Sequence, residues 1–271
     1  MPLFPGRRGA HGSRLATILV VVLAVAVVGG TLLAYRDWQQ RVDDTVDIAR
    51  DDAPPEASGD PSDSTSASPT TEPDTPVSLW IGDGYTAGVG ADSPESGASC
   101  LAAAELGWTC ELDAQEGTGF VSDGQLLDPD SQPLIKRLDD LDPGLQPDVI
   151  VIDAGRNDLR VVSTLTLETA ISRYLERLRG LYPGATFIEI VPWSLAQDED
   201  LPGDLAAYIT EQMQAYDGYT IDPYAEGWAG AGHTDRPGLQ ASDGGATQAG
   251  HAYLGERLAQ AIRALDLPEA G

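Results

Sequence analysis

The chain is poor in positive charge, and this shortage narrows the range of its partners. Of its 271 residues, 16 are lysine or arginine and 43 are aspartate or glutamate, which gives a formal net charge of −27. Lysine occurs once, at Lys136. Nucleic-acid binding requires lysine and arginine to neutralise phosphates, so the composition argues against a nucleic-acid partner. The acidity instead favours solubility and repulsion from anionic surfaces.

Cysteine is also scarce, because the chain has only Cys100 and Cys110, with no histidine between or beside them. This spacing is not that of a zinc site, and we expect no metal or cofactor. Residues 99–106 predict a helix and residues 108–113 a strand that returns beside it, so the two sulfurs can meet. In an oxidising compartment we expect a disulfide, which would stabilise the fold by roughly 2–3 kcal/mol; two reduced, buried cysteines are the alternative.

One long stretch, residues 15–34, has no charged side chain. Its 20 residues, at ~1.5 Å each in a helix, span roughly the 30 Å core of a bilayer. Arg7, Arg8 and Arg14 precede it, which favours a cytoplasmic tail over residues 1–14 and an extracellular remainder. We therefore predict a single-pass plasma-membrane protein. A cleaved signal peptide is the alternative, but the apolar run is longer than the usual ~7–15 residues of such a signal.

Residues 35–76 are predicted to link this segment to the rest of the chain. From residue 53 to 76 there are six prolines, many serines and threonines, and no leucine, isoleucine, valine or aromatic residue. Such a composition cannot bury a core and predicts an extended, disordered spacer.

From residue 77 to 268 the pattern changes to alternating strands and helices. Apolar runs predict strands, and apolar residues at i, i+3 and i+4 predict helices. The strands are expected at 77–81, 108–113, 148–153, 185–191 and 219–221, and the helices at 99–106, 164–181, 205–216 and 247–265. This order predicts an α/β domain of three layers with a central parallel sheet. Ligands of such folds bind beyond the carboxyl ends of the strands.

Four glycine-containing blocks lie at those ends or just before the last helix. They read GDGYTAG from residue 82, EGTGF from 116, AGRND from 154 and SDGGATQAGH from 242. In this order they resemble the signature blocks of the SGNH (GDSL) hydrolases, which are esterases and acyl hydrolases, and the resemblance covers residues 77–268.

The resemblance implies roles for particular residues. The backbone N–H of Gly117 and the side-chain amide of Asn157 match the donors that stabilise an oxyanion. Asp243 matches the aspartate of the family's Asp-x-x-His block. Three further residues match supporting positions of the blocks: Asp83, Gly155 and Asp158. The alternative is that the glycines and Asn157 only shape tight turns.

Two residues of the family's catalytic set are missing. Gly84 stands at the position of the nucleophilic serine, and a glycine has no side chain that could attack an ester. The catalytic histidine would fall at Ala246 when counted from Asp243, or at Gly245 when counted back from His251. Thr86 follows Gly84 by two residues, so the turn that aims the family's serine would direct its side chain elsewhere.

These losses predict a cell-surface pseudoenzyme that keeps an oxyanion-type pocket for an acylated cell-envelope glycan, a small ester or a protein partner. The alternative is a hydrolase of altered mechanism that activates water with His233 or His251. A third possibility is an ectodomain with a purely structural role. His251 matches a histidine inside the family's last helix, distinct from the catalytic one, and we expect it to make a structural contact.

Overall fold

The computed structural model describes residues 75–195, 203–228, 238–242 and 244–268. The predicted membrane segment, nearly all of the predicted linker, His233 and Asp243 lie outside these ranges. Within them, no helix has both the length and the apolar character needed to cross a bilayer.

The described domain is built on a five-stranded parallel sheet. The strands are β1 (Val77–Gly82), β2 (Thr109–Ala114), β3 (Val149–Asp153), β4 (Thr186–Ile190) and β5 (Tyr219–Ile221). Their order across the sheet is β2-β1-β3-β4-β5, and every neighbouring pair is parallel. The predicted α/β class and parallel sheet are therefore confirmed, with strand ends that agree to within one residue.

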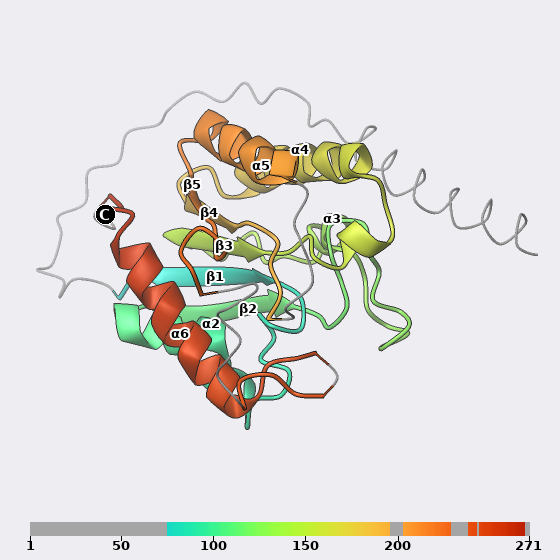
Figure 1. The fold of residues 1–271 in the computed structure, drawn as a ribbon. Helices are drawn as coiled ribbons and strands as arrows, with labels where there is room; N and C mark the ends of the chain where they lie inside the picture. Colours follow the sequence, from blue (N-terminus) through green and yellow to red (C-terminus); the bar gives the residue numbers. More distant parts are fainter. Residues whose placement is uncertain (1–74, 196–202, 229–237, 243, 269–271) are drawn as a thin grey trace, which may run out of the picture. The chain divides into compact units, whose positions relative to one another are not determined.

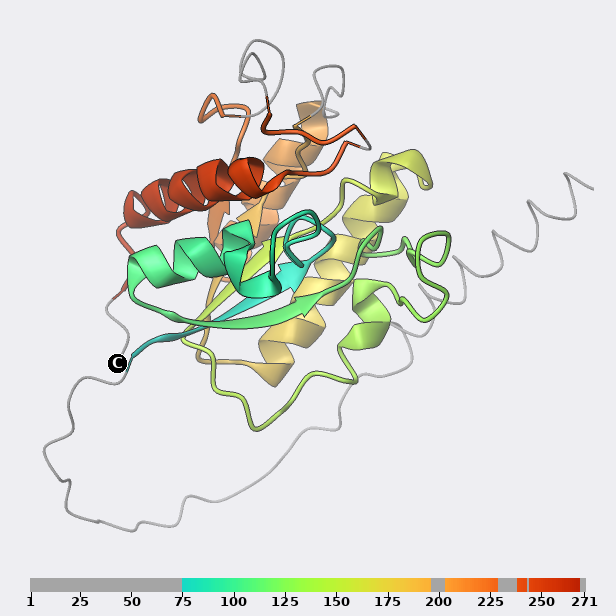
Figure 2. The same cartoon turned by 90° about the horizontal axis from the view of Figure 1, so that it is seen from below.

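Helices cover both faces of the sheet and complete three layers. One face carries α2 (Ala98–Leu106) and α6 (Gln248–Arg263), and the other carries α4 (Thr164–Leu181) and α5 (Gly203–Ala215), as Figures 1 and 2 show. The amphipathic spacing that predicts α4 is realised, because Leu167, Ile171 and Leu175 are fully buried. The side chain of Ser163 accepts a hydrogen bond from the N–H of Thr166 and so marks the start of this helix.

Three short helical turns were not predicted: η1 (Pro94–Ser96), α3 (Leu134–Arg137) and η2 (Asp158–Arg160). Tertiary contacts hold α3 in place. The guanidinium of Arg137 donates hydrogen bonds to the carbonyl oxygens of Gly82 and Asp113 and pairs with the Asp113 carboxylate at 3.2 Å. A run of four residues carries no periodicity of its own, so sequence pattern alone cannot indicate it.

The two faces of the sheet belong to different cores because side chains alternate along a strand. Val149 and Val151 of β3 pack in a cluster with residues of α2 and α6. Ile150 and Ile152 point the opposite way, toward the layer of α4 and α5, and are also fully buried. This burial on both faces explains the continuous apolar run of β3.

Helices α2 and α6 approach each other closely. A Cβ at Gly255 of α6 would lie 2.8 Å from the Cβ of Leu101 and 3.1 Å from the carbonyl oxygen of Ala98. The contact therefore depends on small residues, as Ala98 and Ala102 supply on α2.

The predicted disulfide is confirmed. Cys100 on α2 and Cys110 on β2 are bonded, with their Cα atoms 5.3 Å apart and a sequence separation of 10. The described residues contain no free cysteine and no group of three or more histidine, cysteine, aspartate or glutamate side chains that could hold a metal ion.

Candidate functional site

The first three glycine-containing blocks meet at the carboxyl edge of the sheet. Gly82, the last residue of β1, is in register with Ala114 at the end of β2 and with Asp153 at the end of β3. The residues that follow each strand therefore emerge side by side. This placement agrees with the expectation that the site of a parallel sheet lies beyond its carboxyl ends.

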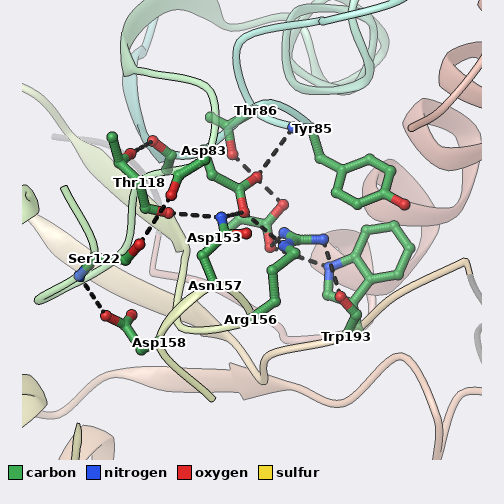
Figure 3. A network of polar contacts seen from close by, with 12 residues as sticks. Asp83, Tyr85, Thr86, Thr118, Ser122, Asp153, Arg156, Asn157, Asp158 and Trp193 are labelled. Atoms are coloured by element: carbon green, nitrogen blue, oxygen red, sulfur yellow. Dashed lines mark hydrogen bonds and ion pairs between the residues drawn. The ribbon is translucent and has the colours of Figure 1, made fainter. Parts of the chain in front are cut away.

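A buried ionic network ties two of these blocks together. The Arg156 guanidinium pairs with the carboxylate of Asp83 at 2.8 Å and with that of Asp153. It also donates a hydrogen bond to the carbonyl oxygen of Trp193, the residue that follows β4 by three positions. Figure 3 shows Arg156 between the two carboxylates and the Trp193 ring. Because all three charged side chains are nearly inaccessible to solvent, loss of one partner would leave an uncompensated buried charge.

Two aromatic rings contact the same arginine. The centre of the guanidinium lies 4.3 Å from the centroid of the Tyr85 ring and 5.0 Å from that of Trp193. These rings stack on each other at 5.0 Å, and the Trp193 indole N–H donates to Asp153. The Tyr85 hydroxyl donates to the carbonyl oxygen of Gly244, so it also links the first block to the fourth.

Burial dominates the electrostatics of the network. It raises the pKa of Asp83 to about 6, with Asp153 acting in the same direction and Arg156 opposing it. Burial also raises the pKa of Asp158 to about 6. The Asp158 carboxylate accepts hydrogen bonds of 2.8 Å from three successive backbone N–H groups, those of residues 120–122, which lowers its pKa part of the way back. Asp158 therefore fixes the loop after β2.

Gly84 sits at the turn after β1, at the position that the resemblance assigns to the nucleophile. Its φ is not in the left-handed region, so the backbone would accept a side chain. A Cβ there would lie 3.2 Å from Cγ of Glu116 and 3.5 Å from Cγ2 of Val89. The exposed side chain of Glu116 thus borders the space where a serine side chain would begin.

Two backbone donors remain unused next to this space. The N–H groups of Gly84 and Gly117 have no acceptor among the described residues. Gly117 has a φ of +74°, which favours glycine. Gly155 has a φ of +102°, and a Cβ there would lie 2.7 Å from Cγ of Pro192. Both glycines therefore shape their turns, and Gly117 also has an N–H without an acceptor in the described ranges.

Asn157 is placed differently from a free oxyanion donor. Its side-chain amide nitrogen lies 2.9 Å from the Asp83 carboxylate and 2.8 Å from the carbonyl oxygen of Thr118, and it donates to both (Figure 3). An amide nitrogen carries two hydrogens, so both are engaged. Asn157 would have to release or share one of these bonds to reach a ligand, and its role as an oxyanion donor stays a prediction.

The fourth block is described except at Asp243. Ala246 is buried, and its Cβ faces the first turn of α6, 3.2 Å from the position that a Cβ of Gly250 would take. Gly245 is partly exposed. The missing histidine would fall at Gly245 or at Ala246, and Gly245 is the more accessible of these two positions.

His251 makes the structural contacts expected for it. It is fully buried; Nδ1 accepts a hydrogen bond from the backbone N–H of Ala98, and Nε2 lies 2.9 Å from the carbonyl oxygen of Val89. This pattern requires the tautomer protonated on Nε2. With both nitrogens held by backbone groups, His251 is not poised to activate water. It is the one histidine among the described residues.

Thr86 is not a replacement nucleophile in this arrangement. The side chain is buried, and its hydroxyl lies 3.5 Å from the Asp153 carboxylate, which holds it beneath Gly82 and away from solvent.

Sequence reasoning missed the residues that organise the site most strongly. Arg156, Tyr85 and Trp193 were not singled out as site residues, although all three follow predicted strands at the carboxyl edge. The signal that the sequence offered was the position of these residues just after predicted strands. A second signal was Arg156, which stands in the same block as the acidic Asp158. Their mutual contacts depend on the tertiary fold.

Comparisons with known proteins agree with the fold. No protein-family model matches the chain, and no curated protein matches it. Solved structures do match. One is a carbohydrate esterase family 2 enzyme of Corynascus thermopiles (Myceliophthora fergusii) with its carbohydrate-binding domain, at 22% identity and a TM-score of 0.54, over 73% of this chain and 68% of that one.

Two further structures give a similar result. The family two carbohydrate esterase of Cellvibrio japonicus is 22% identical, with a TM-score of 0.54 over 71% of this chain and 62% of that one. A protein assigned to the lipolytic G-D-S-L family, from Desulfitobacterium hafniense DCB-2, is 15% identical, with a TM-score of 0.54 over 68% of this chain and 98% of that one. At these identities the likeness establishes the fold and leaves the reaction open.

Proposed function

Since the described domain has the fold of the SGNH-type hydrolases, we propose that it is a pseudoenzyme of that fold, which binds an acylated ligand at the carboxyl edge of its sheet without hydrolysing it. The observation that carries this proposal is Gly84. Nucleophilic ester hydrolysis needs a side chain that attacks and a base that takes its proton. Position 84 offers neither hydroxyl nor thiol, and His251 is held by the backbone.

The remaining groups support binding. The N–H groups of Gly84 and Gly117, for which the described part of the chain offers no acceptor, can donate hydrogen bonds to a carbonyl oxygen, as oxyanion-hole donors do in hydrolases. The likeness to carbohydrate esterases supports an acylated glycan as the ligand. The uncharged segment at 15–34 supports a position at the cell surface, where such a glycan would be met.

Restoring the missing groups tests the proposal. Residues 77–271 would be assayed with p-nitrophenyl acetate as wild type, as Gly84→Ser, and as Gly84→Ser combined with either Gly245→His or Ala246→His. We expect an inert wild type, and a gain of about 10²-fold or more when serine and histidine are both present, because general-base catalysis contributes ~10²–10⁴-fold. The Gly245→His combination should gain more, since Ala246 is buried.

The matched control is Gly84→Ala, which adds a Cβ at the same place without a hydroxyl. It should stay inert. A wild type that already hydrolyses the ester, and loses that activity with Asn157→Ala, would overturn the pseudoenzyme proposal.

A further inference from the structure

The side chain of Glu116 places a negative charge beside the two backbone donors that lack an acceptor among the residues the structure describes. Its Cα lies 3.7 Å and its Cγ 3.2 Å from the position that a Cβ of Gly84 would take, so the two segments touch. Gly117, the second donor, is the next residue in the chain. Glu116 is exposed, and it is one of the acidic residues that give the chain its formal negative charge.

The charge of Glu116 determines which ligands can bind to the two N–H groups. A free carboxylate would gain hydrogen bonds from the N–H groups of Gly84 and Gly117 but would be repelled by Glu116 at close range. A neutral carbonyl, as in an ester or an amide, accepts the same hydrogen bonds without that repulsion.

Each of the two donor residues also has an apolar side chain next to it. A side-chain carbon of Leu127 lies 2.9 Å from the Cβ position of Gly117, and Cγ2 of Val89 lies 3.5 Å from that of Gly84. Leu127 is 63% exposed and Val89 39%, and Leu126, which precedes Leu127 in the chain, is fully exposed. An apolar chain attached to the ligand's carbonyl would therefore find apolar side chains near the donors.

We infer that Glu116 is a specificity-determining residue, which makes the site selective for the uncharged acyl group of an intact ester or amide over the free carboxylate that hydrolysis would release. This inference rests on the proposed function and names its ligand class. It implies that the domain distinguishes an acylated molecule from the free acid.

The test is a comparison of two ligands with the same chain, hexanamide and hexanoate, titrated at pH 7.5 against the full chain in detergent. Hexanamide is neutral and resists hydrolysis. Wild type should bind hexanamide and prefer it to hexanoate, and Glu116→Gln should bind hexanoate roughly tenfold more tightly than wild type does, with hexanamide changed less than twofold. High salt should weaken the discrimination by wild type.

The matched control is Glu111→Gln, which removes the same charge from an exposed position on β2, five residues earlier. It should leave both affinities unchanged. Acetamide, which lacks most of the apolar chain, should bind at least tenfold more weakly than hexanamide.

The outcomes separate the two proposals. Hexanoate affinity that is equal in wild type and Glu116→Gln would overturn the role of Glu116 while leaving an acyl-binding site in place. Absence of binding of either ligand to either protein, with both proteins folded by circular dichroism, would overturn the inference and the proposed function together.

Discussion

Glu189 of β4 is a carboxylic acid in the interior of the domain. It is fully buried, and neither of its oxygens has a hydrogen-bond partner among the described residues. It lies in register with Ile152 of β3 and Thr220 of β5, on the face covered by α4 and α5. Burial disfavours the charged form and raises its pKa to about 8.

This residue makes the stability of the domain depend on pH. A group whose pKa is raised by folding binds its proton more tightly in the folded state. Its contribution to the free energy of unfolding is therefore complete below its ordinary value of 4.5 and is lost as the pH rises toward about 8. Asp83 and Asp158, whose pKa values rise to about 6, act in the same direction over a lower range.

The substitution Glu189→Gln isolates the effect, because glutamine has nearly the same size and cannot ionise. Each pKa unit corresponds to about 1.4 kcal/mol. We expect the free energy of unfolding of the variant to exceed that of wild type by an amount that grows to several kcal/mol between pH 5 and pH 8. Urea unfolding at a series of pH values measures it, with Glu111→Gln as the exposed control. If the free energy of unfolding had the same pH dependence in wild type and in Glu189→Gln, the idea that Glu189 is buried without a partner would be wrong.

At the scale of secondary-structure elements, the Cys100–Cys110 disulfide joins α2 to β2. A loop this short restricts the unfolded chain enough to contribute roughly 2–3 kcal/mol. Replacing both cysteines by alanine should lower the free energy of unfolding by that amount, as measured by urea denaturation. Dithiothreitol should destabilise wild type to the same level and leave the double variant unchanged; an effect of the reductant on the double variant would point to another cause.

The sequence predicted those elements whose own residues specify them. A continuous apolar run indicates β3, and the spacing of Leu167, Ile171 and Leu175 indicates α4. The short α3 could not be predicted, because Arg137 holds it through contacts with residues far away in the chain. Helix and strand ends differ by one or two residues where pairing with a neighbour, and not local sequence, sets the last hydrogen bond.

The candidate site was predictable in outline for a similar reason. Gly117 and Gly155 could be located because their blocks resemble the signature blocks of the SGNH hydrolases, and in the structure both have a positive φ that favours glycine. The engagement of Asn157 by Asp83 and Thr118 could not be foreseen, since it depends on how the loops after β1, β2 and β3 meet.

At the scale of the whole molecule, we propose that residues 15–34 anchor the chain in the plasma membrane and that residues 35–76 hold the domain away from it. The full chain should then sediment with membranes and resist extraction by carbonate, while residues 75–271 should remain in the supernatant. Replacing two central valines of 15–34 with aspartate should release the full chain, since a charge at the bilayer centre costs ~2.5–3.5 kcal/mol. Recovery of the mature protein with a new N-terminus after residue 30 would indicate a cleaved signal peptide instead.

The packing of α6 against α2 has a consequence for how the domain is made. These helices lie about 150 residues apart in the chain. They nevertheless pack directly against each other, because His251 and Gly255 of α6 contact residues of α2. β1 likewise pairs with β3 across nearly 70 residues. Contacts between such distant segments slow folding, because long loops must close, at a cost in entropy, before the contacts can form and stabilise the fold. During synthesis, the part of this face that α6 covers stays exposed until residues 248–263 have emerged, so the domain cannot complete its fold before they are made.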